Sequence, residues 1–262
     1  MAWHPDPSTS TRWARALTWS ATVALVAAWP FVAHAAGSPA WQYQGDNGPD
    51  QWGRLRPAWA VCASGQRQSP VDIVGAQRKA AGALRFDYRA APLRIVNDGH
   101  TVRVRYANGS RMLIGQDAHT LQQFHFHTPG GDRLGGEEFP MAMHLLHKSA
   151  SGRLVSLVLL FRLGAENPAL AELLPRMPAA GQPEQTLASP PFNPSALLPA
   201  SSAHYRYDGS LTAPPCTEGV GWIVMKQPLT LSAEQLARLK HLFPPNARPV
   251  QPLHGRLVTE GD

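Results

Sequence analysis

The chain has 262 residues, of which 44% are hydrophobic and 16% are charged, so it is long and apolar enough to bury a sizeable core. Its 25 Pro and 22 Gly favour many turns and short strands over long helices. The formal net charge is +6, but no basic run is longer than Arg78-Lys79, which argues against a nucleic-acid partner.

The N-terminus has the pattern of a secretory signal peptide. Arg12 and Arg15 precede a mostly apolar stretch over residues 16–32. Ala33-His34-Ala35 then matches the small-residue pattern at which signal peptides are cleaved. We therefore expect residues 1–36 to be a signal peptide.

Cleavage would leave a mature domain of residues 37–262, either periplasmic or secreted. The alternative is an uncut membrane anchor, but the apolar stretch contains hydroxyl side chains and ends at Pro30. A later apolar run, 154–163, is too short to span a bilayer and predicts a buried strand. We expect no membrane association after cleavage. A monomer and a homodimer are both compatible with the sequence.

The chain has two cysteines, Cys62 and Cys216. An exported protein with an even, minimal number of cysteines usually pairs them. We therefore predict one disulfide, with two free thiols as the alternative.

Residues 41–70 are rich in Trp, Gly and Pro, which indicates an irregular segment packed on the body of the protein. Short strands are predicted to follow it at 71–73, 84–88, 93–97, 101–106 and 111–115. Asn108-Gly109, between the last two, is a strong hairpin signal.

The second half of the chain contains two predicted helices. One begins after Asn167, with Pro168 at its first position, and the other begins at a capping box formed by Ser232 and Gln235. The Pro-rich residues 175–200 between them predict a surface coil. Strand segments are predicted at 153–163, 223–225 and 250–253. The fold class is α+β, mostly β, in a single domain.

The segment from Gln123 to His127 alternates polar and aromatic residues, as a strand with two different faces does. Gln123, His125 and His127 then share one face, and the two imidazoles can bind one metal ion. His144 lies on a second predicted strand, 140–147, and can provide a third. Three histidines without a fourth protein ligand are typical of catalytic Zn²⁺. The alternative is a group of histidines that binds no metal.

Other histidines require no function. His119 shares a face with His125 by the same alternation, and we interpret it as a histidine at the edge of the core. His147 falls on the opposite face from His144. His204, with His241 and His254, is predicted to lie at the surface.

Several ordered segments resemble the α-class carbonic anhydrases of the bacterial, exported kind, from about Trp41 to Arg256. The segments that carry the resemblance are 66–73, Asn97-Asp98-Gly99-His100, 123–127, 207–216 and 246–253. The resemblance implies a large twisted, mainly antiparallel central sheet with a few short helices. It also implies reversible hydration of carbon dioxide to bicarbonate and a proton by zinc-bound hydroxide. This family is the standard example of a three-histidine catalytic zinc site.

The resemblance also implies roles for individual residues. His125, His127 and His144 match the zinc ligands, Gln123 and Asn246 match groups that orient two of them, and Cys62 and Cys216 match the disulfide. Thr212 matches the threonine that orients the zinc hydroxide, and His100 matches the proton shuttle. The residues that correspond to the substrate pocket are Leu146, Ser156, Leu211, Ala213 and Trp222.

Some expected groups are missing. The glutamate that normally orients the third ligand is replaced by Ala142, and the one that accepts the threonine's proton is replaced by Gly131. Asp132 is a candidate substitute for the latter. Leu146 and Ser156 stand where valines are usual, and Ala213 and Arg54 replace a threonine and a tyrosine.

Losing an orienting partner typically costs 10–100-fold in metal affinity or activity. We therefore expect a zinc enzyme with weakened carbon dioxide hydration. The alternative is a non-catalytic zinc-binding interaction module that keeps the carbonic anhydrase fold.

Overall fold

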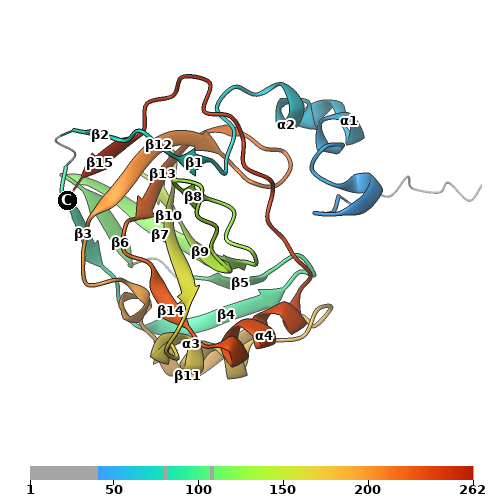
Figure 1. Ribbon diagram of the computed structural model, residues 1–262. Coiled ribbons are helices and arrows are strands. Elements are labelled where there is room, and N and C mark those ends of the chain that lie inside the picture. Colours follow the sequence, from blue (N-terminus) through green and yellow to red (C-terminus); the bar gives the residue numbers. More distant parts are fainter. Residues whose placement is uncertain (1–40, 80–81, 107–108, 262) are drawn as a thin grey trace, which may run out of the picture. The chain divides into compact units, whose positions relative to one another are not determined.

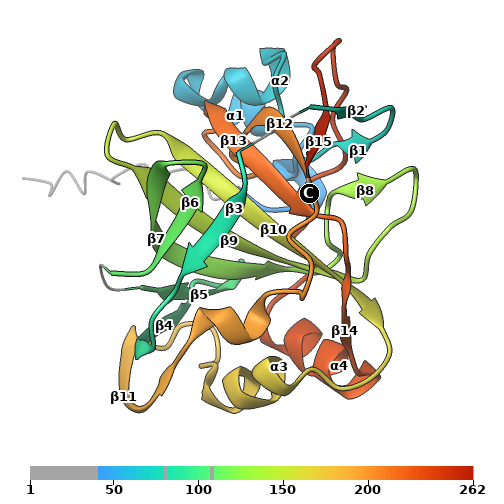
Figure 2. The same cartoon turned by 90° about the vertical axis from the view of Figure 1, so that its left-hand side faces the viewer.

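The computed structural model describes residues 41–79, 82–106 and 109–261. In this range the protein is mostly β, as predicted, and contains a 13-stranded mixed, mainly antiparallel sheet (Figures 1 and 2). Along its main path the strands are β11 (Gln185–Phe192), β4 (Ala91–Asn97), β5 (Val102–Arg105), β7 (Asp117–His127), β9 (Met141–Ser149), β10 (Leu154–Leu163), β13 (Glu218–Met225), β12 (His204–Ser210), β15 (Thr259–Gly261) and β2 (Gln77–Arg78).

Three strands branch from this path: β14 (Leu229–Leu231) pairs with β10, and β6 (Arg111–Ile114) joins β7 to β3 (Leu84–Asp87). The pairs of β10 with β13, β10 with β14 and β15 with β2 are parallel. A separate two-stranded parallel sheet consists of β1 (Asp72–Ile73) and β8 (Arg133–Leu134).

The two faces of the sheet bury different clusters, because side chains alternate along each strand. Phe124, Phe126 and Leu157 belong to the larger core, together with leucines of the helices. Ala142 and Val158 belong to a smaller core on the other face. The continuous apolar run of β10 thus serves both cores, as a central strand buried on both faces does.

The two longer helices begin where the sequence predicts. α3 (Pro168–Leu173) is capped by Asn167, whose side chain accepts hydrogen bonds from two backbone N–H groups. α4 (Ala233–Leu242) begins with a capping box between Ser232 and Gln235. Both helices lie on the side of β14 and β4 (Figure 2) and bury leucines in the larger core. None of the helices in the described part of the chain has the length and apolar character needed to cross a bilayer.

Two predictions about irregular segments are wrong. Residues 175–200 are not one coil: they contain β11 and a 3-10 turn, Pro194–Leu197. The prolines are tolerated because β11 is an edge strand whose pairing with β4 is interrupted between Leu187 and Phe192. Residues 250–253 form no strand, since prolines on both sides of Gln251 leave few N–H donors for a ladder.

The predicted hairpin around Asn108-Gly109 does not form. Ala107 and Asn108 lie outside the described residues, but the strands on either side are described. β5 and β6 do not pair with each other: both run antiparallel to β7, along its second and first halves respectively.

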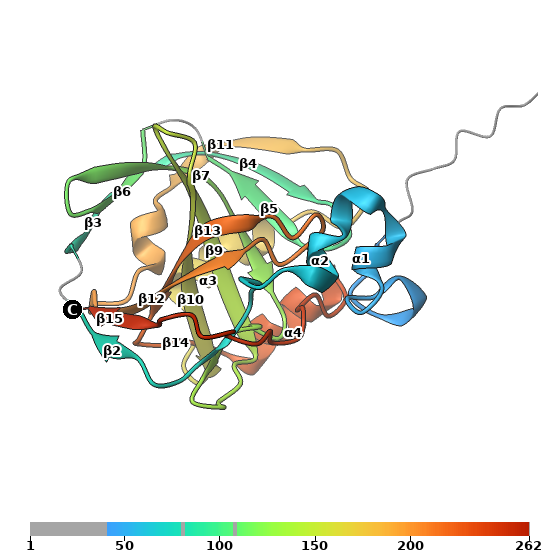
Figure 3. The same ribbon diagram turned by 90° about the horizontal axis from the view of Figure 1, so that it is seen from above.

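The segment over residues 41–70 is short helices and turns packed on the body, as expected (Figure 3). It contains α1 (Trp52–Leu55), α2 (Val61–Ser64) and 3-10 turns at Gly45–Asn47 and Pro57–Trp59; a further 3-10 turn, Leu174–Arg176, follows α3. Cys62 in α2 forms a disulfide with Cys216, 154 residues later, which excludes the free-thiol alternative. This bond ties the segment to the loop that follows β12.

Candidate functional site

The candidate metal centre is built where β7 pairs with β9. His125 lies directly opposite His144 in the antiparallel register, and His127 lies opposite Ala142. Facing residues on one side of such a pair have Cβ atoms about 5 Å apart. Strand alternation places His125 and His127 on the same side, so the pairing brings three imidazoles together.

The geometry of this group fits a metal ion. The ring centroids of His125, His127 and His144 are 4.3–5.3 Å apart. One potential ligand nitrogen from each ring lies within 4.8 Å of the other two. His127 Nε2 is buried and has no hydrogen-bond partner among the described residues. A buried lone pair without a partner is costly unless a ligand satisfies it, so the residues fit a bound cation such as Zn²⁺.

Two of the three imidazoles are held by hydrogen bonds on their outer nitrogen. His125 Nδ1 donates to Gln123 Oε1 at 3.0 Å, and His127 Nδ1 donates to the backbone carbonyl of Asn246 at 2.8 Å. These bonds place the proton on Nδ1 and leave Nε2 free for the metal. The structure therefore brings Gln123 and Asn246 next to the ligands that they were predicted to accompany.

His144 has no such support. Neither of its ring nitrogens has a hydrogen-bond partner among the described residues, and its Nε2 is buried. One nitrogen can bind a metal, but the other then lacks an acceptor. Ala142, two residues earlier on the same face, is fully buried and offers only a methyl group. The ring is instead in edge contact with Trp222, with ring centroids 5.2 Å apart.

Burial keeps these imidazoles neutral. It lowers the pKa of His127 to about 4, and it lowers the pKa of His125 and His144 well below the usual value. Because only the neutral imidazole has a lone pair to donate, the site favours metal binding at neutral pH.

The three histidines open into a cleft of about 180 Å³. All five residues predicted for the substrate pocket line it, namely Leu146, Ser156, Leu211, Ala213 and Trp222, and so do Thr212 and His100. Ser156 lies opposite Leu146 in the β9–β10 register and opposite Trp222 in the β10–β13 register. Leu146, Ser156 and Trp222 therefore form one continuous row across β9, β10 and β13, and this row is a wall of the cleft.

His100 stands on the loop between β4 and β5. Its ring stacks on Trp41, with centroids 4.0 Å apart and planes 6° from parallel. Asp98 Oδ1 accepts hydrogen bonds from the backbone N–H groups of His100 and Thr101, both at 3.0 Å. Asn246 Nδ2 donates to the His100 carbonyl at 2.8 Å, which connects this loop to the residue that holds His127.

The sequence reasoning missed a charged pair in the cleft. Arg103 lies opposite His125 in the β5–β7 register, and its Nη2 donates to Asp98 Oδ2 at 2.8 Å. The alternation of residues 101–106 groups the side chains of that strand into two faces, but it does not say what either face meets. Only the pairing of β5 with β7 shows that the face with Arg103 lines the cleft.

Thr212 and Asp132 do not interact. No described residue accepts a hydrogen bond from the Thr212 hydroxyl, and Gly131 has no side chain to do so. Asp132 Oδ1 instead accepts from Val71 N at 3.1 Å and from the Tyr207 hydroxyl at 2.8 Å. The idea that Asp132 substitutes for the missing glutamate is therefore wrong: its carboxyl group holds β1 and β12 together.

Two predictions about other histidines are wrong. A register irregularity between Leu121 and Gln123 inserts one extra residue in β7, so the alternation reverses there. His119 consequently shares a face with Leu121 and Phe124, away from His125. His204 is fully buried, not at the surface, because its strand lies between β13 and β15.

His147 lies away from the cleft, as predicted, and its Nε2 is 2.7 Å from the hydroxyl of Tyr88. His241 and His254 are exposed, as predicted.

The family model of the eukaryotic-type carbonic anhydrases matches residues 47–261. A carbonic anhydrase of Pectobacterium carotovorum is 38% identical over 238 residues, covering 90% of this chain and 97% of that protein. The α-carbonic anhydrase of Thermovibrio ammonificans, solved with the inhibitor sulfanilamide, has a TM-score of 0.80 and 37% identity over 84% of this chain and 98% of its own. Dioscorin dioA3 of Dioscorea japonica is 35% identical over 81% of this chain and 82% of that protein.

The hydrogen bond from His125 to Gln123 generates a first prediction. Gln123→Leu removes the acceptor while keeping a side chain of similar size, so we expect Zn²⁺ affinity to fall about 10–100-fold. Competition with a chromogenic chelator measures this. Gln122→Leu is the matched control on the same strand, since the Gln122 side chain donates a hydrogen bond to the Thr120 carbonyl and to none of the metal ligands. Equal affinity in both variants would contradict the orienting role.

Asp132 generates a prediction about stability and pH. Burial raises its pKa from 3.8 to about 7, so between those values the folded protein keeps a proton that the unfolded chain has lost. Its contribution to the free energy of unfolding therefore falls as the pH rises from about 4 to about 7. Asp132→Asn removes this contribution and keeps an Oδ1 acceptor.

The stability of Asp132→Asn relative to the original protein should therefore increase with pH across this window. Urea unfolding of both proteins at several pH values, each without zinc, measures the difference. A difference that stays constant from pH 4 to pH 8 would show that Asp132 ionises normally.

Proposed function

This chain belongs to the eukaryotic-type carbonic anhydrase family, and we propose that it is a weakened member of that family. Its reaction is the zinc-dependent reversible hydration of carbon dioxide to bicarbonate and a proton. Three imidazoles in one cleft, with ligand nitrogens within 4.8 Å of one another, are the main support for this function.

The protein's own groups hold the metal. His125, His127 and His144 would be its ligands, and Gln123 and Asn246 keep two of the rings in the tautomer that binds. When bound, zinc lowers the pKa of a water molecule toward neutrality, for which carbonic anhydrase is the standard example. Three neutral ligands leave the charge of the ion uncompensated, which favours this effect.

We assign Thr212 the task of orienting the attacking oxygen through its hydroxyl group. His100, on the loop between β4 and β5, is the residue that carries the proton toward solvent, because its imidazole lines the same cleft as the metal ligands. Carbon dioxide lies against the apolar wall formed by Leu146, Leu211 and Trp222. These roles rest on the family resemblance and on the position of each residue in the lining of the cleft.

Reduced activity follows from two missing acceptors. In the described part of the chain His144 has no partner for its outer nitrogen, so its ring orientation depends on packing alone. Among the described residues the Thr212 hydroxyl has no acceptor, so its proton is free to rotate and the hydroxyl does not enforce one orientation of the nucleophile. An orienting partner of a metal ligand is typically worth 10–100-fold in affinity or activity.

A non-catalytic zinc-binding module is the second candidate function. The alanine at 142 and the glycine at 131 favour it, because both remove groups that serve the reaction and not the fold. The complete set of three ligands, with Thr212 and His100 present in the same cleft, favours the enzyme.

We propose that the protein is exported from the cytoplasm. The disulfide between Cys62 and Cys216 is typical of proteins in oxidising compartments, and the N-terminal sequence has signal-peptide features. We infer a periplasmic or secreted protein. Residues 1–36, the expected signal peptide, lie outside the described residues.

Zinc analysis together with stopped-flow hydration of carbon dioxide tests the function. We expect about one zinc per chain and a hydration rate roughly 10–100-fold below that of a relative that has both glutamates. A rate equal to that relative's would contradict the weakening. Stoichiometric zinc with no hydration would support the non-catalytic alternative.

Ala142→Glu tests the cause of the weakening. The new carboxylate, opposite His127 and two residues before His144, provides the missing acceptor, so we expect the hydration rate to rise about tenfold at equal zinc content. Ala142→Gln is the control of equal size without charge, with a smaller expected gain. Gly131 is left unchanged because its φ of +89° strains any side chain. If the glutamate variant folds, binds zinc and gains nothing, His144 is oriented by other means.

A further inference from the structure

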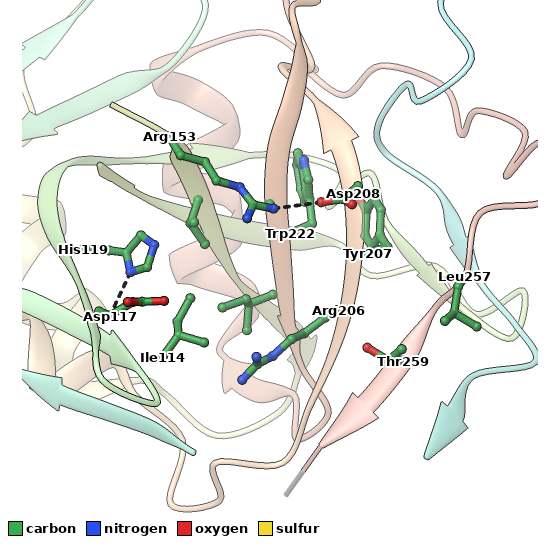
Figure 4. Close-up of a pocket in the computed structure, with 13 residues that line it drawn as sticks. Ile114, Asp117, His119, Arg153, Arg206, Tyr207, Asp208, Trp222, Leu257 and Thr259 are labelled. Carbon is green, nitrogen blue, oxygen red and sulfur yellow. Dashed lines mark hydrogen bonds and ion pairs between the residues drawn. The ribbon is translucent and has the colours of Figure 1, made fainter. Parts of the chain in front are cut away.

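A second cavity, of about 350 Å³, lies on the face of the sheet opposite the metal centre (Figure 4). Consecutive residues of β10 separate the two sites: Val155 lines this cavity, whereas Ser156 lines the metal cleft. The volume is in the range of small-molecule sites. Trp222 lines both sites, but no metal ligand lines this cavity, and neither do Thr212 and His100.

A glycine creates the hollow. In the strand register Gly221 of β13 lies between Asp208 of β12 and Val155 of β10, so one row across the sheet has no side chain at its centre. Arg153 Nη2 donates to Asp208 Oδ1 at 3.0 Å along one side of the gap (Figure 4). A Cβ atom at position 221 would meet Val155 Cγ2 at 3.4 Å and Arg153 Nη2 at 3.6 Å, so a larger side chain would occupy the cavity.

The next row across the sheet supplies polar groups. Arg206 of β12 lies directly opposite Thr259 of β15 on one side and Ile223 of β13 on the other. All three line the cavity. A guanidinium, a hydroxyl and an apolar side chain are thus neighbours on one face.

Arg206 is held in place but has no anionic partner among the described residues. Its Nε donates to His204 Nε2 at 2.7 Å and its Nη2 donates to the Gly82 carbonyl at 2.6 Å, and neither acceptor is a carboxylate. Within the described residues, no carboxylate pairs with Arg206 and nothing accepts a hydrogen bond from Nη1. A partly buried guanidinium that is already oriented loses little entropy when it binds a carboxylate.

The rest of the lining selects the shape and charge of a ligand. Val155 and Ile223 form an apolar floor, and Leu257, 48% exposed, stands at the edge. The two acidic residues leave room for a single negative charge: Asp208 is neutralised by Arg153, and Asp117 is exposed to solvent on the hairpin that carries Ile114 (Figure 4). Arg206 is then the one arginine of the lining without a carboxylate partner among the described residues, so it can neutralise a single negative charge.

We propose that this cavity binds a small monocarboxylate with an apolar body. The carboxylate accepts hydrogen bonds from Arg206 Nη1 and from the Thr259 hydroxyl. The apolar body lies over Gly221, between Val155 and Ile223. This site is separate from the hydration reaction and does not depend on it.

Benzoate is the probe. Its binding is measured by titration calorimetry and by ligand-observed NMR on the zinc-loaded full chain, with the metal cleft blocked by a saturating aryl sulfonamide. We expect binding to persist under this block. Arg206→Gln should weaken it at least about tenfold, the usual effect of losing a hydrogen bond to a charged group. Gly221→Val, which fills the hollow, should weaken it to a similar extent.

Arg238→Gln is the matched control, because Arg238 is an exposed arginine of α4 away from the cavity. It should leave benzoate affinity unchanged. If Arg206→Gln fails to fold, Thr259→Val removes the hydroxyl at constant shape and should weaken binding severalfold.

Three results would overturn the proposal. The first is the absence of benzoate binding at about 10–20 mM, a concentration 10–20 times the millimolar Kd that is typical of a fragment of this size. The second is complete displacement of benzoate by the sulfonamide, which would place it at the zinc. The third is equal affinity in the original protein, Arg206→Gln and Gly221→Val. Loss of hydration activity alone would bear on the proposed function and not on this site.

Discussion

The antiparallel register between β7 and β9 is the constraint on which the metal centre depends. It places His125 opposite His144, and the irregularity at Gln122 decides which face the rest of β7 presents. Because side chains alternate with a period of two, a slip of one residue would turn His125 and His127 into the core and expose Phe124 to the cleft. The buried aromatic residues on one face therefore hold the imidazoles in position on the other.

Support for the three ligands is uneven. His125 and His127 have hydrogen-bond acceptors at the far side of the ring, and one of these acceptors is a backbone carbonyl that no side-chain change removes. His144 depends on packing between Trp222 and the neighbouring strand. Binding a metal requires only that three lone pairs converge, whereas fast chemistry also requires that they be held still. The site meets the first requirement fully and the second in part.

The sheet carries separate chemistry on its two faces. Ser156 contributes to the metal cleft and its neighbour Val155 to the carboxylate-binding cavity, so adjacent residues of one strand serve different sites. Gly221 lines only the carboxylate-binding cavity, whereas its neighbour Trp222 lines both sites. Such closeness is possible because β10 and β13 are central strands whose backbone hydrogen bonds are satisfied within the sheet, which leaves both faces free for side chains.

Local patterns in the sequence were enough to identify β7 as the metal-binding strand, to find the caps of α3 and α4, and, with the resemblance, to identify His144 and the missing acceptors. Tertiary structure alone decided the partner of Asp132, the face of His119 and the place of Arg103 in the cleft. The physical reason is that alternation and capping are set by residues a few positions apart, whereas strand register and bulges are set by pairing between distant segments. The same sequence pattern therefore predicted the face of His125 correctly and that of His119 wrongly.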